Sequence, residues 1–566
     1  MQAMSRLLTL CMGFLLATAV AAQDGSDALE RAMEEIRGGD WDGARDAARG
    51  AGQTVEDIVT WHALRAGRGS PETLTDFLDR NGDWPGLPYL RERAEPVIAE
   101  AGAQAIRAYF ENRTPQTGEG ALALARAEIA AGNTGAAEVQ IVLAWRTLAM
   151  DAEGREEFLD EWGELIAPHH EARLDMALWR NWTVNAGAML PLVDDGWRKL
   201  AEARLGLRAD APGVDGLIAA VPDRLADHPG LAHERFLWRM RKGRFADAAE
   251  LIVERSTGAA ALGEPWAWAD ARLDLARDLM RDGKVVDAYR IAASHYLVDG
   301  SDFASLEWLS GYLALRFLDR ADLALSHFEA FRGAVDTPIS LGRAGYWMGR
   351  AHEALDQPEL AAEDYAFGAR YQTSFYGLLA AERGGLPPDP ALAGDESFGD
   401  WRDAAWTESS VYRAAMLLLR AGEDRLGERF LTHLAESLDR DGIGQMGAML
   451  AEMDRPHIQV MLGKRAAQYG MEIPGPYYAL HPLVAEAEYP VPKELVLAIA
   501  RRESEFDPAV ISGAGARGFM QLMPGTARDV SGWLNLDYDR EALLTDPVYN
   551  ATLGAAYLAA LAERFD

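Results

Sequence analysis

One glutamate near the end of the sequence, Glu503, could act as a general acid and base. It lies in the segment Pro492–Pro508, which predicts a helix, because proline is favoured in the first turn of a helix and disfavours helical backbone at the preceding residue. Helical spacing places Leu495, Ile499 and Phe506 on one apolar face, with Glu503 at its edge. This position suits a general acid, since apolar surroundings help a carboxyl group stay protonated near neutral pH.

Periodicity alone leaves a second interpretation of Glu503 open. It could belong to a solvated run of charges with Arg501, Arg502 and Glu505, because Arg502 lies as close to the apolar face as Glu503 does. Glycosidases usually employ two carboxylates. Glu505 is predicted to face elsewhere on the helix and Asp507 lies at its end, so neither is a convincing second one.

A glycine-rich segment follows at residues 512–527. Gly513, Gly515 and Gly518 match the pattern G-x-G-x-x-G. A dinucleotide site would require a buried strand before the glycines within a βαβ unit, and a predicted helix and loop precede them here. We therefore interpret the segment as a loop whose glycines let the backbone approach a ligand, while Phe519 to Met523 line the bound molecule.

The N-terminus and the cysteine content indicate export. Arg6 is followed by the apolar stretch Leu7–Val20 and by small residues, which predicts a signal peptide over residues 1–22 that is too short to span a membrane. The only cysteine, Cys11, lies within it, so the mature chain forms no disulfide and uses no thiolate. The formal net charge of −32 argues against binding to nucleic acid or anionic membranes. These features favour the periplasm of a Gram-negative bacterium.

The remaining sequence predicts a mainly all-α protein. Four similar segments, each a turn followed by a helix rich in small residues, start 40, 36 and 37 residues apart; they begin at Gly243, Gly283, Asp319 and Asp356. Such periods are typical of helix–turn–helix arrays. We predict an α-superhelical solenoid over residues 23–385, a helical linker domain over 386–470 and a catalytic domain over 471–566.

Three motifs in order resemble the soluble lytic murein transglycosylase family: Glu503-Ser504, the segment from Gly515 to Ala527, and the spacing from Asp546 to Leu558. Phe519 stands where the family usually has leucine. The stretch 346–380 is also similar to the superhelical region of the large periplasmic members. The resemblance implies a ring-like superhelix ahead of a lysozyme-like, mostly helical catalytic domain, and it implies no metal or other cofactor.

The resemblance also implies a mechanism. Glu503 would protonate the β1,4 oxygen between N-acetylmuramic acid and N-acetylglucosamine, while the muramyl 2-acetamido group assists. The same residue would then deprotonate the C6 hydroxyl, giving a 1,6-anhydromuramyl end without water. A muramidase that uses water, and a scaffold without enzymatic activity, remain alternatives. The partners implied are peptidoglycan glycan strands, with no nucleic acid and no membrane span; binding of cell-wall synthesis or remodelling proteins stays open.

Further site residues follow from the same resemblance. Asn550 is expected to cap a helix or fix a loop, and Tyr557 either packs or contacts substrate. Family members continue into an Ala-Tyr-Asn-Ala-Gly-like segment, whereas this sequence stops at Asp566, so we expect a catalytic domain truncated at its C-terminus. The residues predicted to bind substrate or shape the cleft are Ser504, Ser512, Gln521, Met523, Thr526 and Tyr557.

Overall fold

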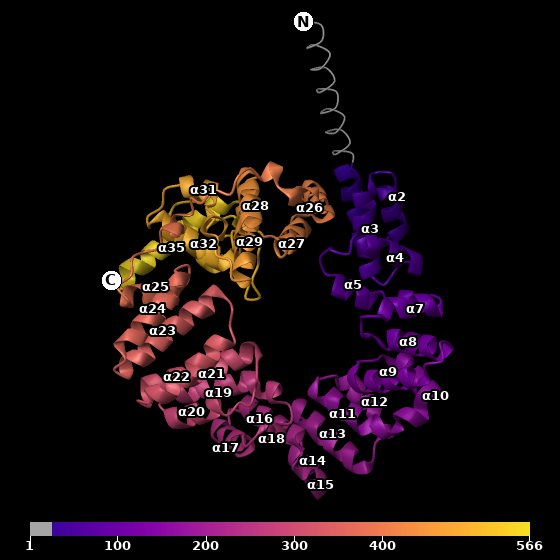
Figure 1. The fold of residues 1–566 in the computed structure, drawn as a ribbon. Helices are drawn as coiled ribbons and strands as arrows, with labels where there is room; N and C mark the ends of the chain where they lie inside the picture. Colours follow the sequence, from indigo (N-terminus) through magenta and orange to yellow (C-terminus); the bar gives the residue numbers. More distant parts are fainter. Residues whose placement is uncertain (1–24, 566) are drawn as a thin grey trace, which may run out of the picture. The chain divides into compact units, whose positions relative to one another are not determined.

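The computed structural model describes residues 25–565, which form helices joined by short turns (Figure 1). Within this range the only extended pairings are two isolated bridges, Ile511–Arg517 and Arg517–Leu522. The predicted all-α class is confirmed. The predicted signal peptide, residues 1–22, lies outside the described residues. Among the helices of residues 25–565, none combines the length and the apolar character needed to cross a membrane.

The chain divides into two compact units. The solenoid unit contains Ala32–Val335 and Ala344–Tyr365, and the C-terminal unit contains the described residues before Ala32, Asp336–Arg343 and the chain from Ala366 onward. The border passes through three helices: the one at 25–38, α23 (Pro338–Ala354) and α24 (Pro358–Gly368). The C-terminal unit therefore begins before the boundary at 385/386 that the sequence suggested, and it holds the linker and catalytic segments together.

The solenoid unit is a succession of short helices. A helix at 25–38 precedes α2. The following helices, in chain order, are α2 (Trp41–Ala48), α3 (Gln53–Arg65), α4 (Pro71–Arg80), α5 (Leu87–Arg93), α6 (Glu95–Ala99), α7 (Ala103–Phe110), α8 (Gly118–Ala130), α9 (Thr134–Thr147), α10 (Ala152–Ile166), η1 (Ala167–His169), α11 (His170–Trp179), α12 (Thr183–Met189), η2 (Leu190–Leu192), α13 (Asp195–Arg208), α14 (Val214–Ala219), α15 (Asp223–Ala226), α16 (Pro229–Arg241), α17 (Phe245–Arg255), α18 (Ala259–Leu262), η3 (Pro265–Trp268), α19 (Ala269–Arg281), α20 (Val285–Ala293), α21 (Gly300–Phe317) and α22 (Ala321–Gly333).

The predicted repeats begin at turns with left-handed backbone. Gly243 and Gly283 have φ of 68° and 76°, and Asp319 and Asp356 have φ of 52° and 55°. Glycine adopts this conformation freely, and aspartate tolerates it better than most residues. In the Gly283 turn the next amide, that of Lys284, donates to the carbonyl of Leu279 at 2.8 Å. Each turn thereby ends one helix and reverses the chain into the next.

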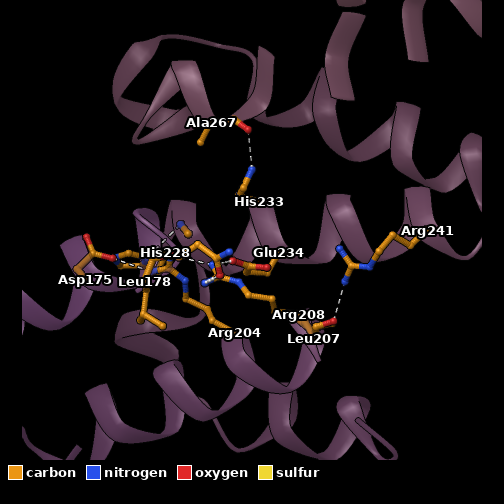
Figure 2. Close-up of polar contacts among 12 residues, drawn as sticks. Asp175, Leu178, Arg204, Leu207, Arg208, His228, His233, Glu234, Arg241 and Ala267 are labelled. Carbon is orange, nitrogen blue, oxygen red and sulfur yellow. Dashed lines mark hydrogen bonds and ion pairs between the residues drawn. The ribbon is translucent and has the colours of Figure 1, made fainter. Parts of the chain in front are cut away.

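Arginine side chains connect successive helices of the solenoid unit. The last carbonyls of a helix have no partner within it. Arg173 of α11 donates to Leu148 at the end of α9 at 3.1 Å. Arg208 of α13 donates to Leu178 of α11 at 2.7 Å, and Arg241 of α16 donates to Leu207 of α13 at 2.8 Å (Figure 2). These three bonds run through four consecutive packing elements, and we call them the arginine relay.

Charged groups are buried beside this relay. The Arg204 guanidinium is fully buried, donates to Asp175 at 2.6 Å and lies 4.9 Å from the ring centre of Trp179. Buried Glu234 is paired with Arg208 (Figure 2). A Cβ on Gly230 would lie 2.3 Å from Cζ of Arg204, so only glycine leaves room for the guanidinium. Pairing offsets the cost of burying these charges.

The C-terminal unit has fewer long helices before residue 410 and more after it. Its elements beyond α24 are η4 (Ala369–Tyr371), α25 (Phe375–Arg383), η5 (Pro390–Ala393), η6 (Trp401–Asp403), η7 (Ala405–Glu408), α26 (Ser410–Arg420), α27 (Asp424–Ala435), α28 (Arg440–Glu452), α29 (Pro456–Gln468), α30 (Pro474–Tyr477), α31 (Pro482–Glu486), α32 (Lys493–Ser504), α33 (Pro524–Trp533), α34 (Ala542–Thr545) and α35 (Pro547–Phe565).

One apolar core joins the linker helices to the catalytic segment. Val460 of α29 is fully buried in a cluster with Val484 of α31, Val496 of α32, Phe519 and Ala551 of α35. Figure 1 shows α29 beside α32. The predicted boundary at 470/471 therefore separates segments that share a core.

Candidate active site

The buried face of α32 differs from the predicted one. Val496, Leu497, Ala500 and Ser504 are its buried residues. Leu495, by contrast, is 42% exposed, Ile499 is half-buried and Glu503 is exposed. Of the predicted apolar face, Phe506 is buried, while Leu495 and Ile499 are not. Residues 495–500 are all apolar, so the sequence offers more than one apolar row here, and the core uses the row next to the predicted one.

This correction gives Glu503 a defined setting. Leu495, Ile499 and Glu503 are spaced by four residues, so they form one row along α32. The core does not cover this row, which is at least partly exposed along its length and ends at the carboxyl group of Glu503. An accessible apolar strip that leads to a carboxyl group can accept a substrate beside its reacting bond.

Two residues in left-handed conformation follow the helix. Glu505, which caps α32, has φ of 48°, and Phe506 has φ of 69°. For residues other than glycine, each such conformation costs about 1–3 kcal/mol and persists only where the surroundings impose it. The chain turns away at these residues, directly after Glu503 and Ser504.

Ser504 joins the helix to the glycine-rich loop. It is 3% exposed, and its hydroxyl is 2.6 Å from the carbonyl oxygen of Phe519 and 3.1 Å from that of Ala500. The buried hydroxyl has no open side for a ligand. Ser504 therefore holds the loop against α32 rather than forming part of the accessible surface.

The loop itself is a tight double reversal between α32 and α33. The amide of Gly518 donates to Val510 at 2.9 Å, and Arg517 and Leu522 exchange backbone hydrogen bonds at 2.9 and 3.1 Å. Gly518 has φ of 71°, and a Cβ there would lie 1.8 Å from the carbonyl oxygen of Leu543. Glycine is therefore required by both conformation and space.

Asn550 fixes this loop from α35, as predicted. It is fully buried, and its Oδ1 accepts from the amide of Met520 at 2.9 Å. Its Nδ2 donates to the carbonyls of Arg517 and Leu543 at 3.0 and 2.9 Å. One side chain thus satisfies three backbone groups of two segments.

The polar side chains predicted to meet the substrate act within the loop here. Oγ of Ser512 accepts from the amide of Ala516 at 3.0 Å. Nε2 of Gln521 donates to the carbonyls of Val510 and Gly518 at 3.2 and 3.0 Å. Gln521 also has φ of 50°. Both contacts of the Gln521 side chain use its amide nitrogen, and neither involves its amide oxygen.

The other predicted residues lie on α33 and α35. Met523 is 44% exposed and precedes the first residue of α33. Thr526 is half-buried in the first turn of the same helix. Tyr557 packs against an apolar cluster that includes Leu522 and Leu553. The structure thus connects Ser504, Ser512, Gln521 and Met523 through one loop, and it gives Tyr557 a packing role.

The carboxylates nearest to Glu503 in sequence are engaged elsewhere. Oε1 of Glu505 is 2.5 Å from Nζ of Lys464 on α29. Oδ1 of Asp507 accepts from the amide of Ala509 at 2.8 Å. Glu503 is therefore the free carboxylate of this helix end. Among residues 25–565, no group of three or more His, Cys, Asp and Glu side chains is arranged to hold a metal ion.

A second anchor holds α32 at Arg501. Its Nε donates to the carbonyl of Tyr477 at 2.7 Å, and its guanidinium lies 4.3 Å and 4.9 Å from the ring centres of Tyr477 and Tyr478. The Tyr478 hydroxyl donates to Thr373 at 2.7 Å. Burial raises the pKa of Tyr478 to about 12, so the hydroxyl stays protonated as a donor.

Sequence reasoning missed two residues that touch this region, His457 and Lys464. Both belong to α29, and they contact Glu505 from positions 48 and 41 residues away in the chain. Their separation by seven residues, two helical turns, places them on one face of α29. That spacing was visible in the sequence, but nothing local connected it to Glu505.

Known proteins are similar to this chain at its C-terminal end and in its fold. Residues 482–566 match the family described as the transglycosylase SLT domain. Within residues 482–566 the chain is therefore similar to this domain family. The soluble lytic murein transglycosylase of Escherichia coli K12 is 38% identical over 76 residues, which are 13% of this chain and 12% of that relative. The match with this lytic transglycosylase thus spans only a small part of the curated relative.

Two solved lytic transglycosylases share the fold over most of the chain. An inactive variant of Slt from Pseudomonas aeruginosa superposes with a TM-score of 0.61 at 20% identity, covering 93% of this chain and 84% of that one. The 70 kDa soluble lytic transglycosylase of Escherichia coli gives 0.53 at 17% identity, covering 96% and 87%. The predicted combination of a helical solenoid with a lysozyme-like domain is confirmed as the fold class.

Proposed function

We propose that this chain cleaves peptidoglycan glycan strands as a lytic transglycosylase, with Glu503 as its acid and base. The observation that carries the proposal is the position of Glu503. It is exposed at the end of an open apolar row on α32, inside a matched SLT domain, while Glu505 and Asp507 are bonded elsewhere. A single free carboxylate fits a reaction in which the substrate supplies the second group.

The chemistry then needs one residue in two protonation states. Protonated Glu503 gives its proton to the glycosidic oxygen, and the bond from that oxygen to C1 of N-acetylmuramic acid breaks. The carbonyl oxygen of the 2-acetamido group stabilises the positive charge at C1. The carboxylate of Glu503 next takes the proton of the C6 hydroxyl, whose oxygen bonds to C1. The products are a 1,6-anhydromuramyl end and a free hydroxyl, and Glu503 is protonated again.

The other predicted residues take supporting roles in this proposal. Leu495, Ile499 and exposed Met523 offer apolar walls for the sugar rings, and Thr526 lies one turn beyond Met523. Ser512 and Gln521 shape the loop and present their remaining acceptor atoms. Ser504 acts through its bond to Phe519. Tyr557 contributes by packing.

The substrate sets the proposed location. Glycan strands of peptidoglycan lie outside the cytoplasmic membrane, so the protein would act in the periplasm of a Gram-negative bacterium after cleavage of its signal peptide. The excess of acidic residues, 88 Asp and Glu against 56 Lys and Arg, makes nucleic acid an unsuitable partner.

The test is Glu503→Gln in the full chain, with Glu494→Gln as the matched control. Glu494 is exposed in the first turn of the same helix, nine residues before Glu503. Because amide cannot donate and then accept the proton, we expect turnover of purified peptidoglycan to fall about 10²–10⁴-fold in Glu503→Gln. Glu494→Gln should match the wild type, and both variants should melt at the same temperature.

Mass spectrometry of the released muropeptides separates the alternatives. Products 18 mass units lighter than the hydrolytic ones, as 1,6-anhydro ends require, support the proposal. Reducing muramic ends instead would identify a muramidase that uses water. Equal turnover of wild type and Glu503→Gln would remove Glu503 from the mechanism, and a wild type without turnover would overturn the proposed activity of this chain.

A further inference from the structure

The helix that carries Glu503 ends in a turn whose backbone conformation is unfavourable for the residues that form it. Glu505 and Phe506 both adopt left-handed backbone, although neither is glycine. Such backbone requires contacts from outside the segment to maintain it. The backbone bond within the turn is that from the Asp507 amide to the Ser504 carbonyl, at 2.9 Å.

Helix α29 supplies such contacts, because two of its side chains form hydrogen bonds with Glu505. Nδ1 of His457 is 2.9 Å from the backbone oxygen of Glu505. Nζ of Lys464, two turns later on the same face, is 2.5 Å from its side-chain Oε1. One contact fixes the peptide group and the other fixes the side chain, so rotation about the backbone of Glu505 is opposed from both sides.

His457 is itself held by a further helix. Its Nε2 lies 3.0 Å from Oε2 of Glu428 on α27. A carbonyl and a carboxylate both accept hydrogen bonds, so the imidazole satisfies both only when both of its nitrogens carry a hydrogen. Burial opposes this charge, but the bonds to Glu428 and to the Glu505 carbonyl outweigh it, and the pKa of His457 is raised.

There is room for the turn to relax if this grip is lost. A cavity of about 570 Å³ adjoins it, lined by Glu428, His457, Phe506 and Asp507, among others. On its other side Phe506 stacks on Phe519, with ring centres 5.3 Å apart. The turn is therefore packed on one face and unsupported on the other, except where α29 holds it.

We propose that the linker helix α29 positions Glu503, with His457 and Lys464 as positioning residues that clamp Glu505. The clamp is the pair of bonds from His457 and Lys464 to Glu505. It fixes the end of α32, and thereby the orientation of the carboxyl group two residues earlier. The proposal rests on the catalytic role of Glu503 given above. It makes the linker a working part of the active site.

The kinetic test pairs each clamp variant with a control variant in which another basic side chain or another histidine is replaced. Lys464→Gln removes one arm of the clamp, while Arg465→Gln removes an ion pair with Glu436 that does not reach the catalytic segment. His457→Gln removes the other arm, while His433→Gln alters a histidine near Glu436 on α27. We expect kcat of the two clamp variants to fall about 10- to 100-fold with KM within twofold of wild type, since misplacement of a reacting group costs rate rather than binding.

Hydrogen exchange gives a readout that does not depend on activity. Amide exchange of the peptide covering residues 503–509 should become faster in Lys464→Gln and stay unchanged in Arg465→Gln. Lys464 is partly exposed, so its replacement leaves the fold intact even if His457→Gln does not. Unchanged exchange and unchanged kcat in Lys464→Gln would overturn the clamp.

A double substitution tests the reason for the clamp. Glu505→Gly removes the strain at this position, because glycine adopts left-handed backbone without cost. His457→Gln should therefore lower kcat less in the Glu505→Gly background than in the wild type. An equal loss in both backgrounds would contradict the proposal. An inactive wild type with normal exchange differences would count against the proposed function alone.

Discussion

His233 shows what complete burial does to a single residue. It is 6% exposed, its Nε2 lies 3.0 Å from the carbonyl of Ala267 (Figure 2), and its ring meets that of Trp268 edge-on at 5.0 Å. Burial lowers its pKa to about 4. The folded state therefore favours the neutral form of the His233 imidazole.

The expected consequence is a pH-dependent stability of the solenoid unit. Since the pKa in the unfolded chain is about 6.5, the unfolded state binds more protons between that pH and about 4. His233 thus contributes fully above the unfolded value, and the contribution is lost as pH falls, by up to about 3 kcal/mol. Urea denaturation at pH 5 and pH 7.5 should show a smaller difference in His233→Gln than in wild type. An unchanged difference would refute this, with His433→Gln as the control.

Part of the active site was predictable at this scale, and part was not. Glu503, the glycines and Asn550 lie in local motifs, so their residue types and spacing were enough to single them out as candidates. The buried row of α32 was not predictable, because Leu495 and Ile499 are as apolar as Val496 and Leu497, so periodicity could not choose between two adjacent rows. The contact of His457 and Lys464 with Glu505 depends on packing across more than 40 residues of sequence.

Among the elements, α35 has the most localised task. Gly554 lets it approach the loop, because a Cβ there would lie 2.5 Å from Sδ of Met520. One turn earlier, Asn550 provides the loop with three hydrogen bonds. The helix therefore supports the loop through close packing at one turn and polar bonds at another.

Replacing Asn550 tests this support. Asn550→Leu leaves buried backbone groups of Arg517, Met520 and Leu543 without their partner, and we expect a loss of about 3 kcal/mol in the free energy of unfolding. Thr552→Val on the same helix removes only a bond back to Val548 and should cost less than about 0.5 kcal/mol. Chemical denaturation measures both. Equal, small effects would show that water replaces the Asn550 amide.

For the whole chain, the shared core matters more than the domain boundaries drawn from composition. Proline- and glycine-rich stretches marked the breaks near 386 and 471, and only short 3₁₀ helices occur between α25 and α26. Composition could not show that Val460 enters the core of the segment that follows. A break in helical pattern is visible in sequence, but a shared core is a property of packing.

This predicts how fragments behave. A fragment that begins at residue 471 loses Val460 and the clamp, so it should unfold without a cooperative transition. A fragment that begins at Ser409 retains α26–α29 and should unfold cooperatively. Thermal scans by circular dichroism compare the two. A cooperative transition of the shorter fragment at the temperature of the longer one would show that α29 is dispensable for folding.

The arginine relay constrains how the solenoid unit can change in length. Arg173, Arg208 and Arg241 each supply the donor for a helix end that precedes their own. Deleting α13 would remove both the donor for Leu178 and the acceptor of Arg241, leaving one carbonyl and one guanidinium unmatched. A deletion of helices preserves the relay only if the remaining arginine meets the carbonyl at the end of the helix that now precedes it. We therefore expect insertions and deletions in solenoids with such a relay to comprise whole repeats, each with one arginine donor and one helix-end carbonyl.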